Sequence, residues 1–425
     1  MPENAPLLPS GLSERRRARG YITLLVPVVL VLATLGVLIF GKREPTDPLG
    51  LAQSWLDHTP VVDGHIDLPI YVREMYGNDV TKFDLGKKMS GHVDIPRMRA
   101  GRLGGFFWSV YTDCHEEIDG PDFLNPSHHV RDTLEQIDLA RNLMDRYSGT
   151  FEFVTTAQGA RDAMARGRIA SFMGIEGAHQ LGNSLGVLRQ YYRLGVRYAT
   201  LTHSCNNAFA DSGGYDKPPN ATWGGLSPFG FELVKEMNRL GMLIDLSHVS
   251  DNTARQAIKA SKAPIMLSHS AARHFNNFSR NVPDDVLEMI GRGKGQTDGV
   301  VMVNFFPSFA SPDPDSVGVA AIADQIDYIV SKTGHHHVGI GSDFDGIDRV
   351  PKGLEDMSKY PYLIAELIRR GWTRYQVAQL AGGNILRVLE GAEGVAARLK
   401  RVKGPSMAKY DKRRDLDGGW GGFEL

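Results

Sequence analysis

Eight short apolar segments recur between residues 50 and 400, and each of them ends in polar residues. Within a segment the apolar residues are nearly continuous, which is typical of strands buried on both faces of a parallel sheet. The segments are 61–67, 104–111, 169–176, 196–203, 243–248, 264–269, 300–306 and 338–346. Stretches with helical spacing lie between or after them, among them 130–147, 228–240, 251–261, 320–333, 362–370 and 373–389. Eight strands that alternate with helices predict an α/β fold, a (β/α)8 barrel of the TIM type.

The polar residues at the segment ends favour this barrel over an open doubly wound sheet, which a different strand count would allow. Seven of them carry side chains suited to catalysis or metal binding: His65, Asp67, Glu176, His203, His248, His269 and Asp343. In a barrel the C-terminal ends of all strands converge on one mouth, whereas an open sheet spreads them along a crevice. We therefore expect one active site at the C-terminal face of a barrel.

The twenty residues 21–40 precede the first strand and carry no charge. As a helix this segment spans about 30 Å, the thickness of the hydrocarbon core of a bilayer. It is longer than the apolar core of a signal peptide, and the residues that end it form a poor cleavage site. Four arginines lie within residues 15–19 and two basic residues follow the segment, so the N-terminus is expected in the cytosol. A cleaved signal peptide and a buried core helix are the alternatives.

These patterns predict five parts of the chain. They are a cytosolic basic tail (1–20), a transmembrane signal anchor (21–41), a linker (42–50), a catalytic barrel domain (51–395) and a C-terminal tail (396–425). The barrel would then lie in a lumenal or extracellular space. Two glycosylation sequons, at Asn220 and Asn277, agree with that location.

Composition narrows the class of protein. Of the 425 residues 42% are hydrophobic, so the chain can bury a large core and does not resemble a disordered protein. The net charge of −1 gives no electrostatic basis for binding nucleic acid. Two cysteines are too few for a disulfide scaffold or for the ligand set of a zinc finger.

Several strand-end residues form a pattern that suits metal ions. His65 and Asp67 are two residues apart on a strand, so their side chains point to the same side and can bind one cation. Glu176 has two carboxylate oxygens and can bridge two cations about 3.5–4 Å apart. His248 and His269 end neighbouring strands and suit a second zinc ion. Each residue taken alone also fits a structural hydrogen bond, a helix cap or a salt bridge.

Three further residues suit catalysis or substrate binding. Asp343 can accept a proton from water on the metal ions. His203 can polarise a carbonyl group, although a structural role is the alternative, and Arg280 can pair with a substrate carboxylate. The Asp343 segment also resembles the start of a calcium loop, but no glutamate closes that loop. The histidine tract 335–337 is expected to form a solvated turn on the opposite side of the barrel.

Together these motifs resemble the renal (membrane) dipeptidase family of zinc metallopeptidases over residues ~50–395. The matching segments are VVDGHIDLP, GIEGAH, TLTHSCN, DLSHVS, SHSAAR and GIGSDFDG. The resemblance implies that a hydroxide bridging two zinc ions cleaves the peptide bond of dipeptides. It implies that His65 and Asp67 bind one ion, that His248 and His269 bind the other, and that Glu176 bridges them.

The resemblance also assigns roles outside the metal ligands. It implies that His203 contacts the scissile carbonyl or oxyanion, that Arg280 binds the carboxylate side of the substrate and that Asp343 handles the proton of the hydroxide. Cys114 and Cys205 match an intrachain disulfide pair. Since other cysteines of the family are missing, a homodimer would be non-covalent. The mammalian members carry a C-terminal lipid anchor, which we expect the N-terminal helix to replace.

Two other functions are compatible with parts of this pattern. Another binuclear barrel hydrolase, such as a deacylase, lactonase or phosphotriesterase-like enzyme, often bridges its metals with a carbamylated lysine, and Glu176 in that place argues against it. The second alternative is a catalytically inactive binding scaffold. Such a protein would not need a complete set of metal ligands, so the complete set in this sequence argues against it.

Overall fold

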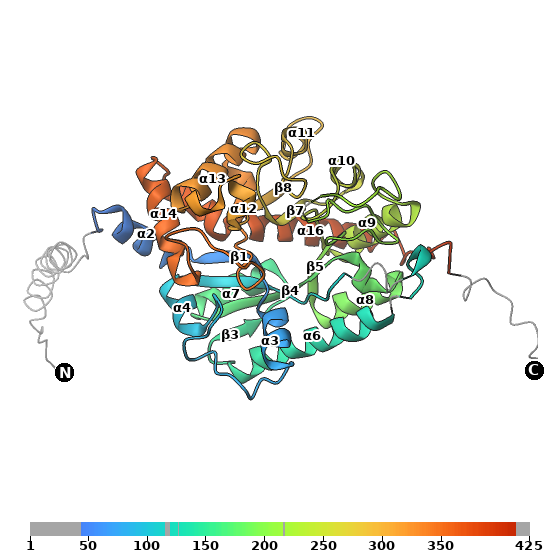
Figure 1. Cartoon of the computed structure of the whole chain (residues 1–425), viewed down its shortest axis with the longest axis horizontal. Helices are drawn as coiled ribbons and strands as arrows, with labels where there is room; N and C mark the ends of the chain where they lie inside the picture. Colours follow the sequence, from blue (N-terminus) through green and yellow to red (C-terminus); the bar gives the residue numbers. More distant parts are fainter. Residues whose placement is uncertain (1–43, 115–119, 126, 216, 414–425) are drawn as a thin grey trace, which may run out of the picture. The chain divides into compact units, whose positions relative to one another are not determined.

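The first and the last of eight parallel strands meet, so that the strands form a ring (Figure 1). In ring order these strands are β1 (Val61–Ile66), β2 (Leu103–Ser109), β4 (Ile169–Glu176), β5 (Val196–Thr200), β6 (Leu243–Asp245), β7 (Ile265–Ser270), β8 (Gly299–Val303) and β9 (Val338–Ile340). The ring closes where the backbone N–H of Asp67 donates to the carbonyl of Phe344 at 2.9 Å. The eight predicted strands are all present, and the α/β barrel of the TIM type is confirmed.

The structure is a computed structural model that describes residues 44–114, 120–125, 127–215 and 217–413. The predicted basic tail and membrane anchor, residues 1–41, lie outside this range. Among the described residues, no helix has both the length and the hydropathy that crossing a bilayer requires.

A ninth strand, β3 (Phe151–Phe153), pairs in parallel with β4 outside the ring. The sequence did not predict it, because no continuous apolar segment marks it and its middle residue, Glu152, is charged.

Helices connect the strands and cover the ring. They are α2 (Pro48–Leu56), α3 (Leu68–Tyr76), α4 (Ile95–Ala100), α6 (Ser127–Arg146), α7 (Ala157–Ala165), α8 (Leu185–Leu194), α9 (Pro228–Leu240), α10 (Asp251–Ala260), α11 (Asp284–Leu287), α12 (Pro307–Ala310), α13 (Val319–Thr333), α14 (Tyr360–Arg369), α15 (Arg374–Ala378) and α16 (Asn384–Leu399). Short 3-10 turns lie at 121–123, 178–181, 314–316, 335–337 and 357–359.

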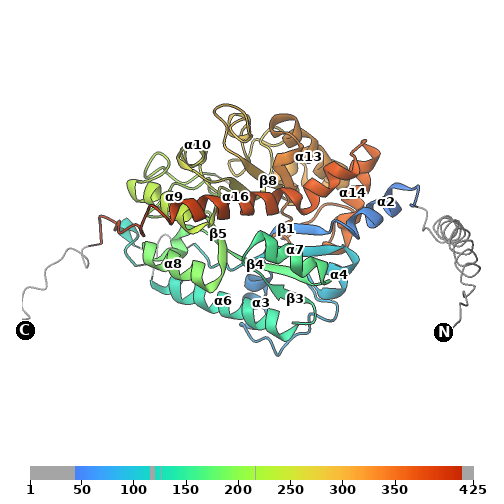
Figure 2. The same ribbon diagram turned by 180° about the vertical axis from the view of Figure 1, so that it is seen from behind.

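The segment 373–389 is not one helix, as predicted, but α15 and the start of α16 joined by a π-helical turn at Gln379–Gly383. The turn packs closely against β1, since a Cβ on Gly382 would lie 2.8 Å from Cγ2 of Val62. The rest of α16 crosses in front of the sheet in Figure 2 and ends at Leu399, so the expected domain boundary at 395 falls inside this helix.

One apolar cluster joins side chains from seven strands of the ring with α7 and α16. Its strand members are Val62, Phe107, Ala170, Phe172, Tyr198, Leu243, Met266, Val300 and Met302. Side chains alternate along a strand, so the residues two positions further on point to the same side. On β6 and β7 these are Asp245 and Ser268, so this side of the sheet changes from apolar to polar towards the strand ends.

The histidine tract 335–337 forms the expected turn before β9, with His336 exposed, but the turn is not solvated throughout. His337 is buried, and its Nδ1 donates to the carbonyl of Gly299 at 2.8 Å. The tract therefore has a structural contact with the start of β8.

Candidate metal centre

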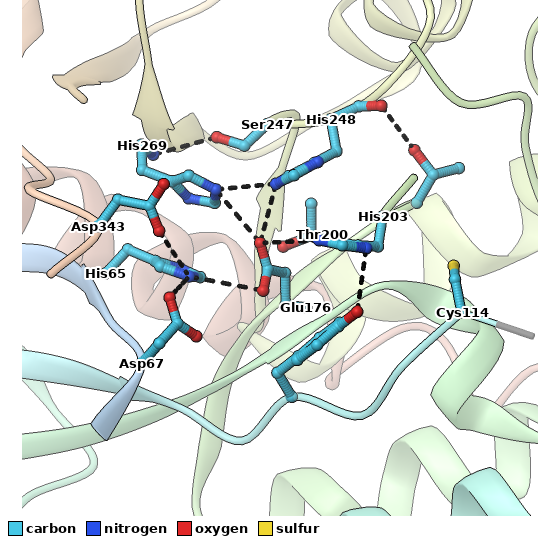
Figure 3. A network of polar contacts seen from close by, with 12 residues as sticks. His65, Asp67, Cys114, Glu176, Thr200, His203, Ser247, His248, His269 and Asp343 are labelled. Carbon is cyan, nitrogen blue, oxygen red and sulfur yellow. Dashed lines mark hydrogen bonds and ion pairs between the residues drawn. The ribbon is translucent and has the colours of Figure 1, made fainter. Parts of the chain in front are cut away.

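The barrel gathers the seven predicted strand-end residues at one mouth (Figure 3). His65 belongs to β1, Glu176 is the last residue of β4 and His269 lies near the end of β7. The remaining members come within three residues after their strands: Asp67 after β1, His203 after β5, His248 after β6 and Asp343 after β9. Segments more than 200 residues apart in the chain therefore contribute to one cluster.

Glu176 lies between two groups of side chains. Its Oε1 is 2.9 Å from Nε2 of His248 and 3.2 Å from Nε2 of His269. Its Oε2 is 3.6 Å from Nε2 of His65, and that same nitrogen is 3.0 Å from Oδ2 of Asp67. Each carboxylate oxygen thus faces its own set of nitrogen or oxygen ligands.

The arrangement fits divalent cations better than it fits a hydrogen-bond network. Nε2 of His65 and Oδ1 of Asp67 are buried without a hydrogen-bond partner among the described residues. Nε2 of His248 and Nε2 of His269 lie 2.9 Å apart, and both are close to Oε1 of Glu176, so three possible ligand atoms converge on one point. Unsatisfied buried polar atoms are rare, and imidazole nitrogen with carboxylate oxygen is the ligand set that zinc prefers.

Burial and charge shift the pKa values of this cluster in two directions. Burial alone would lower the pKa of His65, but Tyr198 and the carboxylates of Asp67 and Glu176 raise it well above the ordinary value. Burial lowers the pKa of His248 and of His269 well below the ordinary value. Burial alone would raise the pKa of Glu176, but the histidines around it hold that pKa well below its usual range. At His248 and His269, neutral imidazoles beside the ionised carboxylate of Glu176 are the forms in which these groups bind metal ions.

A cavity of about 260 Å³ opens onto the cluster. Its lining comprises Asp67, Ile70, Glu74, Tyr111, Glu176, His203, Tyr215, His248, Phe306, Phe309, Asp343, Asp345, Gly346 and Ile347. The volume lies near the lower end of the range of small-molecule sites, about 300–1,000 Å³. Only a small substrate fits beside the cluster.

Asp343 lies on the rim of the cluster, with Oδ1 4.0 Å from Nε2 of His65. Burial and the nearby Asp67 raise its pKa well above the ordinary value. Its backbone is left-handed, with φ of 66°. The backbone at Gly346 lies close to the carboxylates of Asp67 and Asp343. A Cβ on Gly346 would be 2.3 Å from Oδ2 of Asp67 and 2.8 Å from Oδ1 of Asp343.

His203 lies beside Glu176, with Nε2 3.9 Å from Oε1. The ring of Tyr111 packs on it at 4.6 Å between centroids, and the Tyr111 hydroxyl is 3.3 Å from Nδ1. The sequence did not predict Tyr111, although it follows the end of β2 and so occupies the same place as the predicted residues. In the sequence Tyr111 counts as an apolar aromatic residue, so its polar hydroxyl group is not considered.

Arg280 is buried next to the cluster but does not line the cavity. Its Nη2 donates to the carbonyl of His269 at 2.9 Å, and its guanidinium lies 5.5 Å from the ring centroid of Phe309. Burial lowers its pKa to about 10, and its Nε has no partner among the described residues. The positive charge is therefore held behind the wall that Phe309 forms.

The predicted disulfide between Cys114 and Cys205 is present, with the two Cα atoms 5.9 Å apart. Cys114 follows Tyr111 by three residues and Cys205 follows His203 by two, so the bridge ties together the two strand ends that carry this pair. The sequon residues Asn220 and Asn277 are both exposed.

Known proteins resemble this chain over most of its length. The model of the membrane dipeptidase family (peptidase family M19) matches residues 51–403. An uncharacterized dipeptidase of Schizosaccharomyces pombe is 44% identical over 392 residues, which cover 91% of this chain and 93% of that protein. Dipeptidase aclJ of Aspergillus oryzae is 44% identical over 352 residues, which cover 81% of each.

Solved structures of other proteins also resemble this chain. A metallopeptidase from Rhodobacter sphaeroides, liganded with a phosphinate mimic of the dipeptide L-Ala-D-Ala, has a TM-score of 0.69 and 28% identity, over 78% of this chain and 99% of that one. The fold also matches that of the probable dipeptidase PvdM from Pseudomonas aeruginosa, with a TM-score of 0.73 and 24% identity over 82% of this chain and 99% of that one. This chain belongs to the membrane dipeptidase family.

Proposed function

We propose that this protein hydrolyses the peptide bond of dipeptides and uses two zinc ions to do so. The observation that carries the proposal is the place of Glu176, whose two oxygens face separate ligand sets. His65 and Asp67 would hold one ion, His248 and His269 the other, and Glu176 would bridge them. The dipeptidase relatives at 44% identity support the activity.

When bound, two such cations polarise a carbonyl group and make water a nucleophile near neutral pH. The protein contributes proton transfer and orientation. Asp343 would take up the proton of the attacking water and pass it to the leaving amine, for which its raised pKa suits it. His203, whose pKa burial lowers, would hold the carbonyl oxygen of the substrate.

The preference for dipeptides follows from both ends of the site. Arg280 would attract the C-terminal carboxylate of the substrate from behind Phe309. On the cavity wall, Asp345 and Glu74, which are not proposed metal ligands, would offer carboxylates to a free ammonium group. A longer peptide would have to place an uncharged segment at one of these positions, within a cavity of about 260 Å³.

The test is metal analysis together with a substrate panel on the full chain purified in detergent. We expect two zinc ions per chain, cleavage of dipeptides but not of tripeptides, loss of activity with a chelator and recovery with added zinc. Dipeptides with a C-terminal D-residue belong in the panel, because a relative binds a mimic of L-Ala-D-Ala. Cleavage that resists chelation, or activity on esters alone, would contradict the proposal.

Glu176→Gln provides a matched comparison with Glu152→Gln. Both changes remove one carboxylate charge, but Glu152 lies on β3 and pairs with Arg166 at the surface. We expect Glu176→Gln to lose zinc and activity and Glu152→Gln to keep both.

We also propose that residues 21–41 anchor the protein in a membrane as a single pass, with the N-terminus cytosolic and the barrel lumenal or extracellular. The charge asymmetry around this segment supports the orientation, and the disulfide suits an oxidising compartment. Asn220 and Asn277 would carry glycans, and any homodimer would be non-covalent. Protease protection and glycosidase digestion of the membrane-bound protein test this topology.

A further inference from the structure

We propose that Asp245 acts through Ser268 to keep the proton of His269 on Nδ1, so that Nε2 of this imidazole faces the cluster as a bare ligand nitrogen. The inference rests on the proposed metal centre. It concerns positioning residues, because neither Asp245 nor Ser268 lines the cavity or faces the proposed metal position.

Asp245 is the last residue of β6 and is fully buried. Four groups donate hydrogen bonds to its carboxylate. Oδ1 accepts from the backbone N–H of Ser247 at 3.1 Å and of Ser268 at 2.8 Å. Oδ2 accepts from the hydroxyl of Thr200 at 2.5 Å and from the hydroxyl of Ser268 at 2.6 Å. All four contacts are made by donors, which is the environment of an ionised, acceptor-only carboxylate.

The direction of the next hydrogen bond follows from this. Ser268 has one hydroxyl hydrogen, and the carboxylate of Asp245, at 2.6 Å, takes it in preference to Oγ of Ser247 at 3.4 Å. Oγ of Ser268 also lies 2.8 Å from Nδ1 of His269, where it can then only accept. Nδ1 of His269 must therefore carry the proton, which leaves the lone pair on Nε2.

That lone pair points at the proposed metal position. Nε2 of His269 lies 3.2 Å from Oε1 of Glu176 and 2.9 Å from Nε2 of His248. A bare nitrogen gains nothing from the carboxylate oxygen of Glu176 unless a cation lies between them, and it can accept from Nε2 of His248 in only one tautomer of that residue. The relay thus maintains a ligand form that would be unfavourable in a protein without metal.

The other two histidine ligands are not determined in this way. Nδ1 of His65 contacts the hydroxyl of Tyr198 at 2.7 Å, and a phenol can donate or accept. Nδ1 of His248 has no hydrogen-bond partner among the described residues. Within the cluster as described, the tautomer is dictated at His269.

The chemistry predicts an unequal effect of two substitutions. Ser268→Ala removes the relay and leaves His269 free to adopt either tautomer. Asp245→Asn should weaken zinc binding more. The amide oxygen of the new side chain can still accept from both backbone N–H groups, but its NH₂ group takes the place of Oδ2 and donates to Oγ of Ser268. The Ser268 hydroxyl must then donate to Nδ1 of His269, which moves the imidazole proton to Nε2, the wrong atom for a ligand.

The experiment measures zinc affinity by chelator competition on the full chain in detergent, with thermal unfolding of the metal-free protein as a separate readout. Ser171→Ala is the matched control, since it removes a buried hydroxyl on β4 that bonds to the carbonyl of Ile169. We expect one of two zinc ions to bind about tenfold more weakly in Ser268→Ala and about a hundredfold more weakly in Asp245→Asn. The control should bind both ions as the wild type does.

The outcomes separate the two proposals. A wild-type protein without zinc would contradict the proposed function itself. A wild type with two zinc ions, together with variants that bind them equally well, would overturn the relay alone. A Ser268→Ala effect equal to or larger than that of Asp245→Asn would also overturn it. If Asp245→Asn fails to fold, a tenfold difference between Ser268→Ala and Ser171→Ala supports the relay, and no difference refutes it.

Discussion

The side-chain amide of Asn304 donates to Oδ2 of Asp343 at 2.8 Å and leaves Oδ1 directed towards His65. Asn304 follows β8 directly and also accepts from the backbone N–H of Phe306. Its own orientation is therefore fixed, and through it that of the proposed proton acceptor. The sequence had not predicted Asn304, because it lies inside the apolar segment 300–306 and two phenylalanines follow it.

Asp343→Asn tests the proton-transfer role. An amide cannot take up a proton near neutral pH, so kcat should fall by about 10²–10⁴-fold. The zinc content should stay at the wild-type value, because Asp343 is not among the proposed ligands. Wild-type turnover in this variant would exclude the role.

Asn304→Ala tests whether the orientation of Asp343 matters. A hydrogen bond to a charged group is worth about 1.5–3 kcal/mol, which corresponds to a fall in kcat of roughly 10–100-fold if it is lost in the transition state. Steady-state kinetics of Asn304→Ala, Asp343→Asn and the double variant would check this. An additive double variant would mean that the two residues act separately.

Tyr111→Phe keeps the ring on His203 and removes the hydroxyl that lies 3.3 Å from Nδ1. We expect kcat to fall about fivefold, with little change in KM, because one neutral hydrogen bond contributes about 1 kcal/mol. Tyr147→Phe is the matched control, since the Tyr147 hydroxyl bonds to the backbone of Leu85 away from the cavity. Equal kinetics for the two variants would contradict a role for Tyr111.

Replacing both Cys114 and Cys205 by alanine should destabilise the barrel and disturb the site. The bridge joins residues 91 positions apart, and removing such a link lowers the free energy of unfolding by about 4–5 kcal/mol in the chain-entropy model. Turnover should also fall, because the segments that carry Tyr111 and His203 lose their link. Urea unfolding measures the first effect. Addition of a reductant should lower the free energy of unfolding of the wild type and leave that of the double variant unchanged.

Glu236 on α9 predicts a pH-dependent contribution to stability. Its carboxylate binds Arg239 at 2.8 Å, Arg189 at 3.1 Å and the backbone N–H of Ser406 at 3.1 Å. Burial alone would raise its pKa, but these donors hold the pKa below the ordinary value. A lowered folded-state pKa means that the stabilisation is present above the unfolded pKa of 4.5 and is lost as pH falls through the folded pKa.

Glu236→Gln should therefore lower the free energy of unfolding by about 1–3 kcal/mol at pH 7. The difference from the wild type should shrink as pH falls below 4.5. Denaturant unfolding at several pH values checks both statements. A difference that grows in acid would show that the sign is wrong.

The pattern of apolar segments determined most of the architecture. Long buried strands show as continuous apolar segments because both of their faces are covered, and parallel strands place their ends at one edge. His65, Glu176 and Asp343 could therefore be predicted to share a site. The strand β3 and the π-helical turn at Gln379–Gly383 could not be predicted, because neither has a hydrophobic period that a short stretch of sequence reveals.

Tertiary structure decided the contacts beneath and beside those residues. Asp245 reaches His269 through Ser268 because β6 and β7 pair with Asp245 opposite Met266, and that register cannot be inferred from either segment alone. Asn304 and Tyr111 likewise act through neighbours on other strands. Residue type and strand period are local properties that the chain itself carries, whereas the direction of a hydrogen bond depends on which strands the closed ring sets side by side.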